Sequence, residues 1–172
     1  MAGLKIGARV LQTHSRDSGL ISTLAGVVGL SGQACAVVAD HEEAAAFKRA
    51  AATKGVLVEV TVAPLNNLPY DPESFDVVVF KNALGQLRQH IRIACLQQTH
   101  RVLRPGGRCL VIEQAMRGGL GALWSKQSLD QQYAKFGGAQ GALSAEGFLG
   151  VRVLADRDGV SFTEGTRGST DG

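Results

Sequence analysis

Several features that would mark a particular class of protein are scarce in this sequence. Aromatic residues make up 5% of the 172 residues and charged residues 19%, and the formal net charge is only +3. No basic run alternates with aromatic residues, so a surface that stacks nucleic-acid bases is not expected. Hydrophobic residues make up 45% of the chain, which is enough to build a folded core and excludes a wholly disordered protein.

Cysteine is also rare, and its placement excludes two kinds of structure. The three cysteines, Cys35, Cys95 and Cys109, form neither a CxxC pair nor a disulfide framework. Cys35 and Cys109 lie inside apolar runs, so we expect them to be small buried hydrophobic residues. The four histidines show no metal-ligand spacing, and no metal site is predicted.

Long hydrophobic segments are missing as well. No apolar run approaches the length of a membrane span, and the N-terminus shows no charged-then-apolar leader. These observations predict a cytoplasmic protein without a membrane span.

The apolar residues that are present alternate between strand-like and helix-like spacing. Strands are predicted at 9–13, 33–40, 56–62, 75–80, 108–113, 151–154 and 160–164, and helices at 19–29, 41–54, 85–103 and 144–148. This alternation is typical of a doubly wound α/β sheet that is mostly parallel. Asp158-Gly159 predicts a hairpin turn near the C-terminus.

The organisation of the chain indicates one domain. Residues 1–167 are predicted to fold as a unit, and 168–172 to form a flexible polar tail. The glycine-rich stretch 114–141 interrupts the regular alternation, and no helix or strand is predicted within it before the short helix at 144–148.

Two motifs in the stretch 68–113 carry a family resemblance. Ser74-Phe75-Asp76 precedes a run of valines, and Leu103-Arg104-Pro105-Gly106-Gly107 precedes a second apolar strand. This stretch resembles the second half of a class I S-adenosylmethionine-dependent methyltransferase, of the small-molecule type that includes quinone methyltransferases. The resemblance extends from Val10 to about Arg167. It implies a Rossmann-like, seven-stranded, mostly parallel sheet with an antiparallel C-terminal hairpin strand.

The resemblance is weaker in the loop after the first strand. There the family has an acidic residue followed by glycines, which let the backbone approach the cofactor closely. In this chain Gln12 stands at the acidic position, and His14, Arg16 and Ser18 stand where glycines belong. Side chains at these positions oppose such an approach. Because the loop precedes a predicted helix, an anion at the helix start is an alternative ligand; otherwise Arg16 is solvated and Ser18 caps the helix.

Other positions retain candidates for binding S-adenosylmethionine. Asp40 matches the acidic residue that binds the ribose hydroxyls, whereas Pro64 replaces the one that binds the adenine amine. Leu65 and Asn66 are candidates to line an adenine slot, and Lys81 follows the fourth strand, beside the cofactor in the family. The resemblance therefore assigns six candidate cofactor-binding residues, namely Asp40, Ser15, Gly19, Leu65, Asn66 and Lys81.

Two functional hypotheses follow from this contrast. The first is a methyltransferase-fold protein with weakened or lost S-adenosylmethionine binding that acts as a binding or scaffolding subunit. The alternative is an active methyltransferase on a small-molecule or lipid-like acceptor. No catalytic residue is assigned, because methyl transfer depends mainly on proximity and alignment. A protein partner or a second copy is expected to use residues 118–138 or an exposed sheet edge. Five arginines are predicted to form solvated surface: Arg88, Arg92, Arg101, Arg104 and Arg108.

Overall fold

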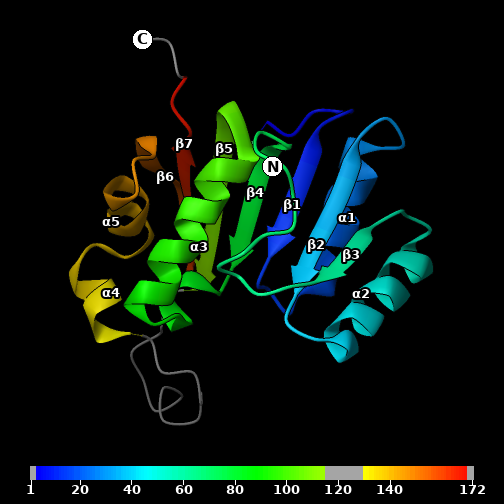
Figure 1. Cartoon of the computed structure of the whole chain (residues 1–172), viewed down its shortest axis with the longest axis horizontal. Helices are drawn as coiled ribbons and strands as arrows, with labels where there is room; N and C mark the ends of the chain where they lie inside the picture. Colours follow the sequence, from blue (N-terminus) through cyan, green and yellow to red (C-terminus); the bar gives the residue numbers. More distant parts are fainter. Residues whose placement is uncertain (1–2, 115–129, 170–172) are drawn as a thin grey trace.

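The computed structural model describes residues 3–114 and 130–169, and these residues build a seven-stranded sheet (Figure 1). The strand order is β3-β2-β1-β4-β5-β7-β6. The first five strands are parallel, and β7 runs antiparallel to both β5 and β6. The strands are β1 (Arg9–Thr13), β2 (Gln33–Val38), β3 (Glu59–Val62), β4 (Phe75–Lys81), β5 (Leu103–Gln114), β6 (Leu149–Arg157) and β7 (Val160–Thr166). The predicted fold class is therefore confirmed.

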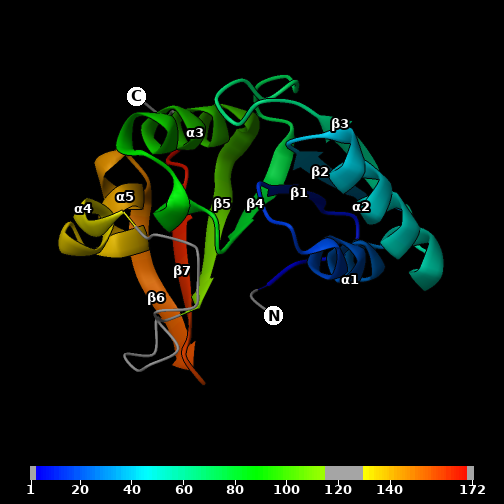
Figure 2. The same cartoon turned by 90° about the horizontal axis from the view of Figure 1, so that it is seen from below.

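Helices cover both faces of this sheet. They are α1 (Ser18–Val28), α2 (His41–Lys54), the short 3₁₀ helix η1 (Leu84–Gln86), α3 (Gln89–Val102), α4 (Gln131–Lys135) and α5 (Gly138–Ala145). Figure 2 shows α3 on the opposite side of the sheet from α1. Val10 and Ala34 pack with α1 and α2, whereas their neighbours Leu11 and Cys35 pack in the cluster that includes α3 and α5. The strands lack polar alternation because both of their faces are buried.

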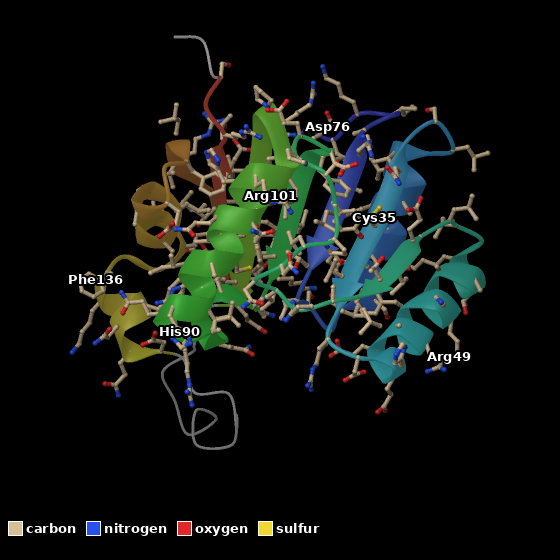
Figure 3. The ribbon with its side chains drawn as sticks, viewed as in Figure 1. Cys35, Arg49, Asp76, His90, Arg101 and Phe136 are labelled. Atoms are coloured by element: carbon tan, nitrogen blue, oxygen red, sulfur yellow. The ribbon has the colours of Figure 1, made fainter. Side chains whose placement is uncertain are left out.

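The three cysteines lie in the core, as predicted. Cys35 on β2, Cys95 on α3 and Cys109 on β5 are free thiols with no solvent exposure (Figure 3 labels Cys35). Burial raises the pKa of Cys35 and of Cys95 to about 12, and it raises the pKa of Cys109 well above its usual range.

The turn between β6 and β7 also agrees with the sequence. Asp158 and Gly159 have φ angles of 54° and 75°. Two consecutive residues with positive φ match the primed turns that join tightly twisted antiparallel strands. The hairpin predicted at Asp158-Gly159 is confirmed.

The family motif around Pro105 has a different local structure from the one predicted. The helix predicted at 85–103 is divided into η1 and α3, and β5 already begins at Leu103, where it pairs with Phe75. The pairing is irregular between Phe75 and Val77, and Pro105, which has no N–H to donate, lies in the irregular part of β5. Gly106 and Gly107 instead exchange backbone hydrogen bonds with Arg167, at 2.9 and 2.8 Å. The Pro-Gly-Gly segment therefore joins the sheet to the end of β7 as well as ending a helix.

The described part of the glycine-rich stretch is helical, and its prediction as irregular structure was wrong. Asp130 caps α4 by accepting a 3.0 Å hydrogen bond from the N–H of Gln132. Gly137, with φ of 88°, turns the chain from α4 into α5. Gly141 permits a close contact, because a Cβ there would lie 1.7 Å from the carbonyl oxygen of Phe136. These glycines allow two short helices to meet.

Candidate functional site

The point at which the strand order reverses lies between β1 and β4. From β1 the chain continues to β2 and β3 on one side, and β4 and β5 lie on the other. In open α/β sheets, ligands bind in the crevice at such a point, beyond the carboxyl ends of the strands. The residues that follow β1 and end β4 therefore define the candidate site, which we call the switch-point crevice. Thr13 ends β1 and Lys81 ends β4.

Gln12 organises the loop between β1 and α1. Its side chain is 1% exposed, and its amide nitrogen donates to the carbonyl oxygens of Ser15 at 3.4 Å and Asp17 at 2.9 Å. Ser15, also buried, accepts a 3.2 Å hydrogen bond on its hydroxyl from the N–H of Asp17. An ionised carboxylate at position 12 has no N–H to donate to these carbonyls. The glutamine thus holds a compact loop that the family's acidic residue would not hold in this way.

His14, which the resemblance aligns with a glycine of the family, has a glycine-like backbone. Its φ is 51°, a left-handed value that glycine adopts at no steric cost but that other residues rarely adopt. The ring is half-buried, and its Nδ1 has no hydrogen-bond partner among the described residues. Burial lowers the pKa of His14 to about 4, so the ring is neutral at physiological pH.

Asp17 connects α1 to β4. One carboxylate oxygen accepts hydrogen bonds from the N–H groups of Gly19 at 2.9 Å and Leu20 at 3.1 Å, and the other oxygen pairs with the ammonium of Lys81. Burial alone would raise the pKa of Asp17, but Lys81 and the two N–H groups together leave it below its usual value. The carboxylate of Asp17 already occupies the start of α1, where an external anion was considered in the sequence analysis.

Asp40 lies immediately beyond β2 and is exposed. It caps α2 by accepting a 2.8 Å hydrogen bond from the N–H of Glu43, and Glu43 accepts one of 3.1 Å from the N–H of Ala39. Glu43 also pairs with Arg16 at 3.1 Å, and the Arg16 side chain is otherwise exposed. Asp40, which the resemblance aligns with the family's ribose-binding position, is thus a helix cap in this structure.

The other candidate residues are only partly brought together. Ser15, Gly19 and Lys81 all contact Asp17 around the switch-point crevice. Leu65 is buried in the core beneath the connection from β3 to β4, whereas Asn66 beside it is exposed. Asp17 caps α1, and its pair with Lys81 could not be predicted, because 64 residues separate the two and no spacing rule links them.

A second cluster of functional groups lies between α3 and α4. Arg92 is 6% exposed, so its prediction as solvated surface was wrong. Its guanidinium donates to the carbonyl of Leu87 at 2.9 Å and to Asp130 at 3.2 Å, and it lies 4.7 Å from the centre of the Tyr133 ring. The Tyr133 hydroxyl donates to Glu113 at 2.7 Å. Burial raises the pKa of Glu113 above its usual value.

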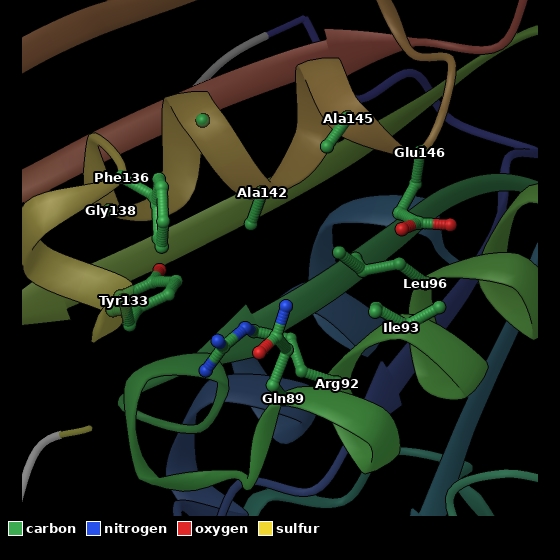
Figure 4. Close-up of a pocket in the computed structure, with 11 residues that line it drawn as sticks. Gln89, Arg92, Ile93, Leu96, Tyr133, Phe136, Gly138, Ala142, Ala145 and Glu146 are labelled. Atoms are coloured by element: carbon green, nitrogen blue, oxygen red, sulfur yellow. The ribbon is translucent and has the colours of Figure 1, made fainter. Parts of the chain in front are cut away.

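This cluster forms part of the wall of a groove of about 300 Å³ between α3 and the α4–α5 pair (Figure 4). Arg92 and Leu96 line it from α3, and Ala142 and Ala145 line it from α5. Phe136 stands at its margin with 73% of its surface exposed (Figure 3). The guanidinium of Arg92 is already hydrogen-bonded to protein groups. The main effect of the cluster is therefore to connect α4 to α3 and β5.

Two general features of the described residues bear on the class of protein. Over residues 3–114 and 130–169, no group of three or more His, Cys, Asp or Glu residues is placed to hold a metal ion. None of the helices in the same ranges is long and apolar enough to cross a membrane.

The sheet order defines a Rossmann-like α/β protein whose strand order reverses between β1 and β4. A family model described as "Methyltransferase domain" matches residues 18–111, which is more than half of the chain. The chain therefore belongs to the class I S-adenosylmethionine-dependent methyltransferase family, as its motifs predicted. No curated protein matches the sequence.

Solved structures of the same fold agree with this assignment. A SAM-dependent methyltransferase from Aquifex aeolicus superposes with a TM-score of 0.76 and 19% identity, over 96% of this chain and 85% of that one. A putative methyltransferase from Bacillus halodurans gives 0.72 and 12%, over 98% and 96%. A putative methyltransferase of Haloferax volcanii, in a complex with the Trm112 methyltransferase activator, gives 0.69 and 16%, over 98% and 85%.

Proposed function

We propose that this chain is a methyltransferase-family protein with weakened S-adenosylmethionine binding that acts as a binding or scaffolding subunit. The observation that carries the proposal is the loop after β1. Gln12 draws the carbonyls of Ser15 and Asp17 toward itself, and the His14 side chain stands at a left-handed position where the family has glycine. The residues present therefore fit the cofactor poorly at the place where the backbone should approach it most closely.

The extent of the family match supports this proposal. The match begins at Ser18, so β1 and the loop after it lie outside the matched residues. The matched residues include β2, β3, β4 and most of β5 with α1, α2 and α3, and β6 and β7 also lie outside them. The loss of two charge-assisted contacts at positions 12 and 64 weakens binding by about 1.5–3 kcal/mol each. Together these losses correspond to roughly two to four orders of magnitude in the dissociation constant.

A role as a subunit requires a surface for a partner. Phe136 lies within the segment 118–138 that the sequence analysis assigned to this role, and it is 73% exposed. Residues 118–129 of that segment lie outside the described residues. The Haloferax volcanii neighbour, which is bound to an activator protein, is an example of this fold in a protein complex.

The alternative function, an active methyltransferase on a small-molecule or lipid-like acceptor, is favoured by Asp40. Its carboxylate is exposed at the carboxyl end of β2, and the α2 cap accounts for one of its two oxygens. The second oxygen is available to a ribose hydroxyl. This function requires the loop after β1 to open.

Isothermal titration with S-adenosylmethionine and S-adenosylhomocysteine tests the proposal. We expect no binding with a dissociation constant below about 100 µM, which corresponds to about 5.5 kcal/mol. Tighter binding of either ligand by the wild-type chain would overturn the proposal and favour the active enzyme. A His14→Gly variant, which restores the family residue, serves as a matched control and should bind more tightly than the wild type.

A further inference from the structure

The switch-point crevice is crossed by one ion pair, which we call the Asp17–Lys81 bridge. Asp17 comes from the start of α1 and Lys81 from the end of β4, on the two sides of the point where the strand order reverses. Both side chains are about one-third exposed, at 34% and 33%. The bridge therefore lies at the mouth of the crevice, where solvent reaches it, and not in the core.

The two partners are held differently. One oxygen of Asp17 is fixed by the N–H groups of Gly19 and Leu20, and the Gln12 amide holds the Asp17 carbonyl. For Lys81, by contrast, the Asp17 carboxylate is the hydrogen-bond partner that the described residues supply to its ammonium. The aspartate is thus a fixed anchor, and the lysine is the part that can swing away on its flexible stem.

We propose that the Asp17–Lys81 bridge is an autoinhibitory contact that closes the switch-point crevice against nucleoside ligands. The proposal rests on the proposed function, because it explains part of the weakened cofactor binding by a contact within this chain. A ligand that enters between β1 and β4 must first separate the two side chains. A partly exposed ion pair is weak and is screened by salt, so the closed state is only modestly favoured. The bridge therefore acts as a reversible gate.

Two variants remove the Asp17–Lys81 bridge, one by changing the aspartate and the other by changing the lysine. Asp17→Asn keeps a helix-capping residue and removes the charge, and Lys81→Met keeps the apolar stem and removes the ammonium. We expect each to bind S-adenosylhomocysteine roughly fivefold more tightly than the wild type in calorimetric titrations at millimolar ligand. The double variant should gain no more than either single variant, because both remove the same contact.

The matched control is Arg16→Gln. It removes a charge and an ion pair, with Glu43, next to Asp17 in the sequence but outside the bridge. Its affinity should equal that of the wild type. Equal gains in Arg16→Gln and Lys81→Met, which both remove one positive charge, would assign the effect to net charge and overturn the proposal.

A salt titration of the wild-type chain tests the gate without any substitution, in case a variant fails to fold. Raising NaCl from about 0.05 M to about 0.5 M shortens the screening length severalfold. Binding of the net-neutral S-adenosylhomocysteine should become tighter in the wild type and stay unchanged in Lys81→Met. Unchanged affinity in both variants and across the salt range, or no binding by any form, would overturn the gate. Tight binding by the wild type would instead overturn the proposed function and leave the ratio between variant and wild type as the test of the gate.

Discussion

Two regions of the molecule, β4 to β5 and β1 to α1, both combine a strand with a helix. Their polar residues make different kinds of contact. In the first, Arg101 donates to the carbonyls of Leu68 and Tyr70 at 2.9 and 2.8 Å and so secures the connection before β4. In the second, the buried Gln12 amide donates to the carbonyl of Asp17, and the Asp17 carboxylate pairs with Lys81. The polar contacts of the first region therefore fasten a connection to the sheet, whereas those of the second hold the loop beside the switch point. Our proposal that this loop binds S-adenosylmethionine weakly concerns the second region alone.

The largest change in stability is expected from a substitution of Gly107, in the Leu-Arg-Pro-Gly-Gly motif. A Cβ there would lie 2.8 Å from the carbonyl oxygen of Arg104 and 3.2 Å from that of Phe75. Because both contacts are backbone atoms, Gly107→Ala should lower the free energy of unfolding by about 1–3 kcal/mol. Urea denaturation measures this change.

The matched control for Gly107 is Gly26, within α1. A Cβ at Gly26 meets nothing within 4 Å, so Gly26→Ala should raise stability by about 0.5–1 kcal/mol through helix propensity. If Gly107→Ala were as stable as the wild type, the motif would no longer be explained by packing, and the contrast between the two regions would fail.

A smaller effect is expected from the protonation of His14. The unfolded side chain takes up a proton below a pKa of 6.5, whereas the folded one stays neutral until about pH 4. Stability should therefore decrease as the pH falls from 6.5 to 4, and the contribution is fully present above 6.5. With allowance for the half-buried ring, the loss is about 1–2 kcal/mol.

His14→Asn isolates this contribution, because asparagine tolerates the left-handed backbone and does not titrate. Urea denaturation of both proteins at pH 7.5 and pH 4.5 should show a difference that grows in favour of the variant at the lower pH. A difference that is independent of pH would mean that the His14 ring is solvated, and the loop would then be more open than described above.

The smallest effect concerns Asp40, which is either a cap or a ligand-binding residue. Asp40→Ala should cost about 1 kcal/mol of stability, because it removes the hydrogen bond to the N–H of Glu43. Asp40→Asn keeps a capping side chain and should cost less than half as much, as measured by thermal denaturation. Equal losses in the two variants would show that the charge, and not the cap, is what matters at this position.

Much of the fold could be predicted because its signals are local. The apolar runs that became β1, β2 and β4 are buried on both faces, and the Asp158-Gly159 turn has its own dipeptide signature. The start of β5 could not be predicted, because a proline such as Pro105 normally ends a helix or a strand. The pairing of Leu103 with Phe75, and the hydrogen bonds of Gly106 and Gly107 with Arg167 about 60 residues further along the chain, draw this segment into the sheet.

The site was less predictable because its contacts are long-range. The positions of Asp40 and Lys81 at strand ends followed from the family pattern, and both lie at the ends of the expected strands. The sequence gives no sign that Lys81 pairs with Asp17, or that Arg92 turns inward to Asp130. Each of these ion pairs depends on how separate elements pack together. Their roles in binding stay predictions.

The three buried thiols carry a consequence for the chemistry of the whole chain. Only the thiolate reacts readily with oxidants and alkylating agents, and burial holds Cys35, Cys95 and Cys109 in the protonated form. The folded protein is therefore expected to react slowly with these reagents, and faster when a segment opens. Cys35 on β2, Cys95 on α3 and Cys109 on β5 all pack in one core cluster. Oxidation of these cysteines would thus record that this shared part of the core had opened.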